Sequence, residues 1–264
     1  MKINLLDKRA CSRELQKTDA FMVCLNEYTL KHLIKKASVN EYLVSLANSG
    51  EDFSEVQKHF VERAFFDIIA PTWAELGLPE ITVNIAVTDG SDMGNSGLPY
   101  TRGNTIFFDK RVLETKYVET EDFVQLLAHE CFHVLSRMNP SIKNKMYNFF
   151  GFTLAKDMDI GIVNPDCPVS NYAIEINGVK YIPWMEMPTT RSLSNHILMY
   201  DLEKGESVKA VDTEIFELIG KTTKYVSHPE EICADFFMQL FVTDSWADLE
   251  KLDNFKEELV KCLK

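Results

Sequence analysis

One segment, from about residue 120 to residue 139, constrains the fold more than any other. It has the pattern of a helix that is apolar on almost every side, yet it carries His129, Glu130 and His133. A helix of this kind is buried by the rest of the chain. Buried polar side chains need partners, because leaving them unpaired costs on the order of several kcal/mol. We therefore expect this helix to be buried, and its two histidines and Glu130 to need partners.

The run His129-Glu130-Cys131-Phe132-His133 has the form H-E-x-x-H. On a helix with 3.6 residues per turn, His129 and His133 are about 40° apart and Glu130 is about 60° from His133. Both imidazoles can therefore reach one metal ion while Glu130 faces the ion's water. Cys131 points about 160° away from His129, so we assign it to the core. The alternative is a pair of core histidines without a metal.

A second acidic segment lies about a hundred residues further on. Ser227-His228-Pro229-Glu230 fits a capping box, with Ser227 as N-cap and Glu230 reaching back to its backbone N–H. Glu231 is the better metal ligand, because Asp235 follows it by four residues and shares its face. Asp235 could accept a hydrogen bond from the outward N–H of a ligating histidine, without the pattern saying which one. The alternative for Glu231 is an exposed acid at a helix start.

These two segments together resemble the gluzincin branch of the zincin metallopeptidases. The resemblance rests on His129-Glu130-x-x-His133 followed by Glu231-x-x-x-Asp235. It implies Zn²⁺ held by His129, His133 and Glu231, with Glu130 as general base and an edge strand before the helix that aligns the substrate. A looser likeness is to toxin-type zinc proteases, in which a Tyr also stands shortly before the ligand Glu. Arg137-Met138-Asn139-Pro140-Ser141 does not fit the longer metzincin motif.

The expected mechanism follows from metal chemistry. Zinc lowers the pKa of its bound water toward about 7, and Glu130 removes the proton as a carbonyl is attacked. A Tyr or His donor usually stabilises the oxyanion as well. Tyr225 and His228 are the first candidates for this role, with Tyr200 and His196 behind them. For each, a surface or packing role is the alternative.

The rest of the chain reads as a mixture of helices and strands. Helical periodicity covers residues 19–48 and 53–70, with Pro71 disturbing or ending the second helix. Strands are expected at 81–87 and 104–109, the latter as a substrate-binding edge or as a plain interior strand. Hairpins are expected around Asn177-Gly178 and Lys204-Gly205, and helices from about residues 229 and 246.

These elements predict an α+β, zincin-like fold. A small sheet and the active-site helix occupy the first half, the second half is mainly helical, and a cleft lies between them. We interpret residues 1–264 as a single zincin-like metallopeptidase domain. Within it, the N-terminal helical part covers about 1–78 and the catalytic core about 79–264.

Composition limits the partners. The formal net charge of -12 argues against nucleic acid, which requires clustered Lys and Arg. No apolar run approaches the length of a membrane span, and residues 1–15 lack the apolar stretch of a signal peptide. The six cysteines show no framework spacing, and Cys24, Cys131 and Cys233 fall in apolar helical patterns. A reducing cytoplasm is therefore expected, although export without a cleavable signal, including delivery into another cell, stays open.

Three functions remain open at this stage. The first is a zinc peptidase acting on a protein or peptide, either as a housekeeping enzyme or as a bacterial effector translocated into another cell. The second is a zinc amidase or other hydrolase acting on a small molecule. The third is a non-catalytic protein with a structural metal, which Glu130 argues against because a structural site has no use for a base. The sequence does not identify the substrate or the oligomeric state.

Overall fold

The computed structural model describes residues 1–114, 121–155, 163–168, 172–186, 196–209, 218–220, 226–242 and 248–263. Within these ranges the chain forms helices and two separate sheets, so the predicted α+β class is confirmed. None of the helices in the described part combines the length and the apolar character needed to cross a membrane.

The first sheet is built mainly from the first half of the chain and includes the very N-terminus. Its strand order is β1-β3-β5-β4, with β2 pairing with the end of β3. The strands are β1 (Lys2–Leu5), β2 (Gly50–Glu51), β3 (Thr82–Thr88), β4 (Tyr100–Arg102) and β5 (Thr105–Asp109). β1, β3 and β5 are parallel, whereas β4 is antiparallel to β5. The 104–109 strand is therefore interior, and β4 lies at the edge instead.

Both faces of the sheet are buried at β3 and β5, which explains the long apolar runs in these two strands. Ile85, Val87 and Phe108 face a large core shared with the central helices. Ala86 and Phe107 face a smaller core shared with the N-terminal helices. The N-terminal part is thus not only helical, because β1 and β2 belong to the sheet that it covers.

The N-terminal helices are shorter and more irregular than their periodicity predicts. The continuous helix expected over 19–48 is broken by separate N-caps at Asp19, Asn26 and Ser38. The range is divided into α2 (Ala20–Cys24), α3 (Glu27–Thr29), the π-helix η1 (Leu30–Ile34) and α4 (Val39–Asn48). A further short helix, α1 (Lys8–Leu15), precedes it.

Pro71 disturbs its helix without ending it. α5 (Glu55–Arg63) passes through a π-helical stretch, η2 (Ala64–Ile69), into α6 (Ala70–Glu75), which contains Pro71. Proline has no N–H to donate to the carbonyl four residues earlier, so the regular α pattern cannot run through it. The wider π turn directly before Pro71 accommodates this loss.

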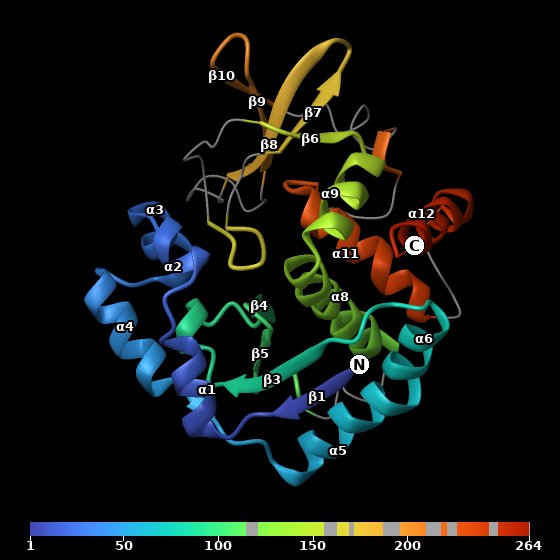
Figure 1. The fold of residues 1–264 in the computed structure, drawn as a ribbon. Coiled ribbons are helices and arrows are strands. Elements are labelled where there is room, and N and C mark those ends of the chain that lie inside the picture. Colours follow the sequence, from blue (N-terminus) through green and yellow to red (C-terminus); the bar gives the residue numbers. More distant parts are fainter. Residues whose placement is uncertain are drawn as a thin grey trace.

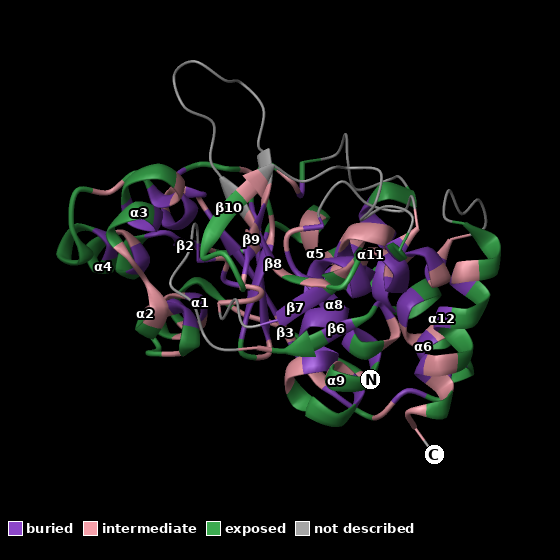
Figure 2. Ribbon diagram, turned by 90° about the horizontal axis from the view of Figure 1, so that it is seen from above, coloured by how far each residue is buried: buried purple, intermediate pink, exposed green. Residues whose placement is uncertain are grey.

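The predicted central helix is α8 (Glu121–Met138), and Figure 1 shows it between the first sheet and α11 (Pro229–Met238). Its predicted N-cap, Thr120, lies outside the described residues. Buried residues concentrate along α8, α11 and β3 (Figure 2). Cys131 and Cys233 are fully buried as predicted, whereas Cys24 is half-buried, and none of the six cysteines forms a disulfide.

Further elements of the second half surround α8 and α11. α9 (Pro140–Phe149), which the sequence did not predict, directly follows α8, and a 3-10 turn, η4 (Gln239–Phe241), follows α11. The expected closing helix is α12 (Leu249–Lys261). Aromatic contacts join these helices, including Phe150 with both Phe236 and Phe255.

In the described ranges, strands as well as helices make up the second half, whereas the prediction described it as mainly helical. It contains an antiparallel sheet in the order β6-β7-β8-β9-β10, drawn above α9 in Figure 1. The strands are β6 (Phe152–Leu154), β7 (Tyr172–Ile176), β8 (Val179–Glu186), β9 (His196–Asp201) and β10 (Glu206–Lys209). Both predicted hairpins are confirmed. The local turn signals did not show that these hairpins join each other and β6 in one sheet.

Candidate metal centre

α8 places His129, Glu130 and His133 together, as expected from their spacing. The two imidazole rings have centroids 4.8 Å apart and are nearly perpendicular, at 82°. His133 and Glu130 are almost fully buried, whereas the side chain of His129 keeps an exposed fraction of 15%. Ligand-capable atoms of all three lie within 4.8 Å of one another.

α11 brings Glu231 to the same pair of histidines. Glu231 Oε2 lies 3.3 Å from Nε2 of His129 and 3.9 Å from Nε2 of His133. The two helices pack against each other along their lengths (Figure 1). The predicted ligand residues from two distant segments therefore meet at one point.

Each histidine has its own carboxylate on the opposite ring nitrogen. Nδ1 of His129 lies 2.9 Å from Asp235 Oδ1, and Nδ1 of His133 lies 3.0 Å from Glu230 Oε1. A carboxylate at Nδ1 favours a proton on that nitrogen, which leaves the Nε2 lone pair free to bind a metal. The open question of which histidine Asp235 orients is thus answered in favour of His129.

The capping-box prediction for Glu230 is wrong. The N-cap of α11 is His228, whose Nδ1 accepts the Glu230 backbone N–H at 3.0 Å. The Glu230 side chain turns inward, where it accepts hydrogen bonds from Ser136 of α8 and Tyr147 of α9 as well as contacting His133. The error arose because Pro229 allows the helix to begin one residue later than the Ser-x-x-Glu spacing suggests.

Mutual charge interactions dominate the electrostatics of the group. Burial lowers the pKa of His129, but Asp235 and Glu231 outweigh it and raise this pKa well above its usual value. Burial raises the pKa of Glu231, but His129 and His133 outweigh it and lower this pKa to about 2. The carboxylates therefore favour a positive charge at the histidines. Protons on the imidazole rings can supply this charge, and a divalent cation can take their place.

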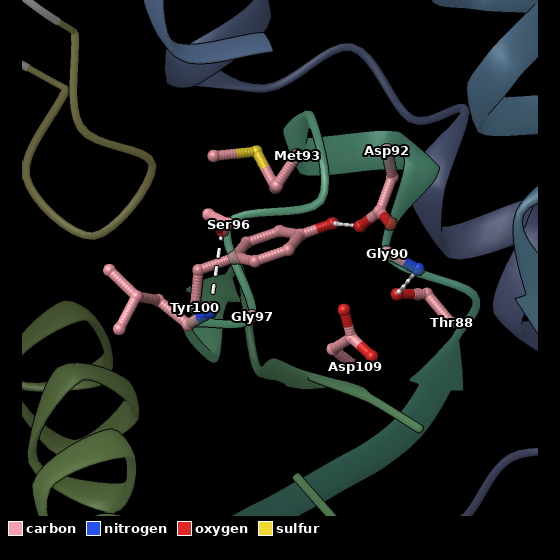
Figure 3. A pocket seen from close by; sticks show the side chains of 9 residues that line it. Thr88, Gly90, Asp92, Met93, Ser96, Gly97, Tyr100 and Asp109 are labelled. Carbon is pink, nitrogen blue, oxygen red and sulfur yellow. Dashed lines mark hydrogen bonds between the residues drawn. The ribbon is translucent and has the colours of Figure 1, made fainter. Parts of the chain in front are cut away.

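Glu130 lies near both histidines and is also bound by the edge strand, β4. Its Oε2 accepts a hydrogen bond from Thr101 Oγ1 at 2.7 Å. Side chains alternate along a strand, so the preceding residue, Tyr100, points to the other face of the sheet. There its hydroxyl bonds to Asp92 in a small pocket lined by the glycine-rich passage (Figure 3). Thus the face of β4 that is turned toward α8 holds Glu130, the proposed base, through Thr101.

A third segment, residues 163–168, also reaches the group. Asn164 Nδ2 donates to Glu231 Oε1 at 2.7 Å, and Asp166 has an oxygen within 4.8 Å of ligand atoms of both His133 and Glu231. Burial raises the pKa of Asp166 to about 7; His133 opposes this rise, and the nearby carboxylate of Glu130 adds to it.

The donor set fits a metal ion on two observations. First, Nε2 of His133 is fully buried and has no hydrogen-bond partner among the described residues. A metal would satisfy this atom, which otherwise carries the cost of an unpaired buried group. Second, two ligand atoms of a tetrahedral zinc site, each about 2.0–2.1 Å from the ion, are about 3.3 Å apart. The Glu231 separations of 3.3 and 3.9 Å are close to this value.

The candidates for oxyanion stabilisation are placed only in part. Tyr225 lies outside the described residues, as does the side chain of His196. His228 is buried, caps α11 and packs against Tyr147 and Tyr172. Tyr200 lies on β9 of the second sheet rather than on α8 or α11.

Several contributors to the site were missed in the sequence. The role of Glu230 could have been recognised, because two adjacent acids at the start of a buried helix both need partners. The Ser-x-x-Glu capping pattern instead suggested that Glu230 bonds to the backbone. The turn at Asn164-Pro165-Asp166 was visible, yet turn residues are common and nothing in their spacing connects them to α8. Thr101 and Tyr147 carry no local signal, since their roles depend on how β4 and α9 pack.

Comparisons of the chain with protein families, with curated proteins and with solved structures found no match.

Proposed function

We propose that this chain is a zinc-dependent peptidase of the zincin type. The observation that carries the proposal is the division of roles among the carboxylates. Glu231 faces both Nε2 atoms, and Asp235 and Glu230 each contact one Nδ1. Glu130 lies near both histidines but forms no ion pair with either, and it accepts a hydrogen bond from Thr101. Two imidazoles and one carboxylate are a known ligand set of catalytic zinc, which leaves a further position open.

The proposed reaction uses Glu130 as general base. When bound, the ion would activate a water molecule and polarise the carbonyl of the scissile bond. Glu130 would take the proton from the attacking water and pass it to the leaving amine. The hydrogen bond from Thr101 fixes the Glu130 carboxylate during these transfers. Tyr225 and His228 stay the proposed donors to the oxyanion.

A protein or peptide substrate is favoured over a small molecule by the edge strand. β4 pairs with β5, and no other strand in the described ranges pairs with its second edge. An extended peptide could add to this edge through backbone hydrogen bonds. The same strand holds Glu130 through Thr101, so a peptide bound there would lie next to the proposed base.

Metal analysis and proteolysis of three proteins test the proposal. Wild type is expected to contain about one zinc per chain. Glu231→Ala should contain much less, because it loses a ligand. Glu130→Gln should keep its zinc and lose peptide hydrolysis by about 10²–10⁴-fold, the usual contribution of a general base. Hydrolysis by Glu130→Gln at the wild-type rate would refute the role of Glu130, and zinc in Glu231→Ala at the wild-type level would refute the ligand set.

A further inference from the structure

Residues 163–168 lie against the proposed metal ligands, and two of these residues contact the carboxylate of Glu231. Asn164 Nδ2 donates to Glu231 Oε1 at 2.7 Å, and the Cys167 thiol lies 3.7 Å from the same oxygen. The other oxygen of Glu231, Oε2, faces the histidines. This segment thus orients the carboxylate and covers the side of Glu231 that the histidines do not contact.

Asp166 brings a fourth ligand-capable group to the site. One of its oxygens lies within 4.8 Å of ligand atoms of both His133 and Glu231. A catalytic zinc site has three protein ligands and an open position, whereas a closed site has four. A carboxylate at this position would take the place that water needs.

The same aspartate also occupies the edge of β4. Asp166 Oδ1 accepts the backbone N–H of Thr101 at 2.6 Å. This N–H points away from β5, so it belongs to the edge at which an extended peptide would pair. Asp166 therefore has two contacts: it covers the Thr101 N–H, to which a peptide substrate would bind, and it lies near the metal ligands His133 and Glu231.

Contacts from two other elements hold the segment in this position. The Arg137 guanidinium of α8 donates to the carbonyl oxygens of Pro165, at 3.2 Å, and Asp166, at 2.8 Å. At the start of the segment, the Val163 N–H donates to Thr29 Oγ1 at 2.9 Å, and the Val163 side chain is buried in the smaller core. The segment is thus built into the fold rather than lying loosely over the site.

We propose that residues 163–168 are an internal plug, in which Asp166 is the fourth protein ligand of the metal and blocks both water and substrate. This inference rests on the proposed function, since it concerns regulation of that site. The folded chain is then a form of low activity, and full activity requires the segment to leave the β4 edge and the metal.

Binding of acetohydroxamate, a small metal-chelating anion, to the cobalt-substituted protein tests the plug without any substrate. The cobalt absorption spectrum reports the binding. Asp166→Ala is expected to bind acetohydroxamate at least 10-fold more tightly than wild type, because it frees the fourth position. Asp166→Asn should behave in the same way, since an amide can still accept from Thr101 but lacks the ligating charge. Asp253→Ala, which removes an exposed carboxylate of α12, serves as the matched control and should bind like wild type.

Casein cleavage in the same samples separates the plug from the proposed function. Cleavage should rise at least 10-fold in Asp166→Ala and be lost when Glu130→Gln is added. Equal acetohydroxamate affinities in wild type and both Asp166 variants would overturn the plug, whatever the cleavage result. Tight binding by Asp166→Ala alone would overturn the ligand role of Asp166. Tight binding by both variants without casein cleavage would support the plug and contradict the peptidase proposal.

Discussion

At the scale of residues, the site depends on two neighbouring glutamates with different tasks. Successive residues on a helix point about 100° apart. On α11 this rotation sends Glu231 to the Nε2 side of the histidines and Glu230 to the Nδ1 side of His133. Burial raises the pKa of Glu230, but His133, Ser136 and Tyr147 outweigh it and bring this pKa below its usual value. Glu230 is therefore an ionised acceptor for His133.

Glu230→Gln tests this positioning role. The amide keeps the size of the side chain but removes the charge that holds the His133 ring and favours a proton on its Nδ1. Loss of such a partner typically lowers metal affinity about 10–100-fold. Zinc affinity can be measured by competition with a chromogenic chelator. Glu250→Gln, at an exposed position, is the matched control and should leave the affinity unchanged. Wild-type affinity in Glu230→Gln would show that His133 needs no such partner.

The sequence revealed those residues of the site whose role follows from spacing within one element. His129, Glu130 and His133 are neighbours on any helix, and Asp235 shares a face with Glu231 on any helix. Asp166 could not be predicted, because it reaches His133 only through the path of the 163–168 segment. Glu230 was misassigned for a related reason, since a local capping pattern and a distant histidine compete for the same side chain.

At the scale of elements, the position of Glu231 depends on how α11 packs against α8. Phe237 of α11 joins the two helices to α6 through ring contacts with Phe132, at 5.4 Å, and Trp73, at 5.8 Å. All three side chains are almost fully buried. The contact between the helices is thus an aromatic core directly beneath the site.

Phe237→Ala should destabilise the protein by about 3–5 kcal/mol, since it leaves a large cavity in this core. The free energy of unfolding can be measured by urea titration followed by circular dichroism. Phe66→Ala, the same change at a side chain with an exposed fraction of 59%, should alter it by less than about 0.5 kcal/mol. Similar losses in the two variants would argue against tight packing of α11 on α8.

Elements were predictable where a local signal determines them. Asn177 and Gly178 both adopt positive φ, at 52° and 81°, as the two-residue hairpin turn requires. By contrast, α9 was missed, and the helix expected over 19–48 is divided because caps within it compete with its periodicity.

At the scale of the whole molecule, the pairing of distant strands is what the sequence did not show. β1 pairs in parallel with β3, so Ile3 lies opposite Val83, about eighty residues away. Local patterns indicate that a segment is extended, but not which partner it takes. The same limit applies to the second sheet, where two predicted hairpins and β6 form one layer. The core helices, in contrast, were recognisable because a helix that is apolar all round has to be buried.

Zinc should stabilise the whole molecule, because its proposed ligands come from α8, α11 and the 163–168 segment and separate on unfolding. At a free zinc concentration of 100 times Kd, this linkage contributes about 2.7 kcal/mol. For a chain of roughly this size, that energy corresponds to an increase in Tm of about 5–10 °C. Differential scanning calorimetry with and without zinc measures the increase, and His133→Ala should show almost none. An equal increase in His133→Ala would mean that zinc binds elsewhere on this acidic chain, and no increase in either protein would contradict a metal centre.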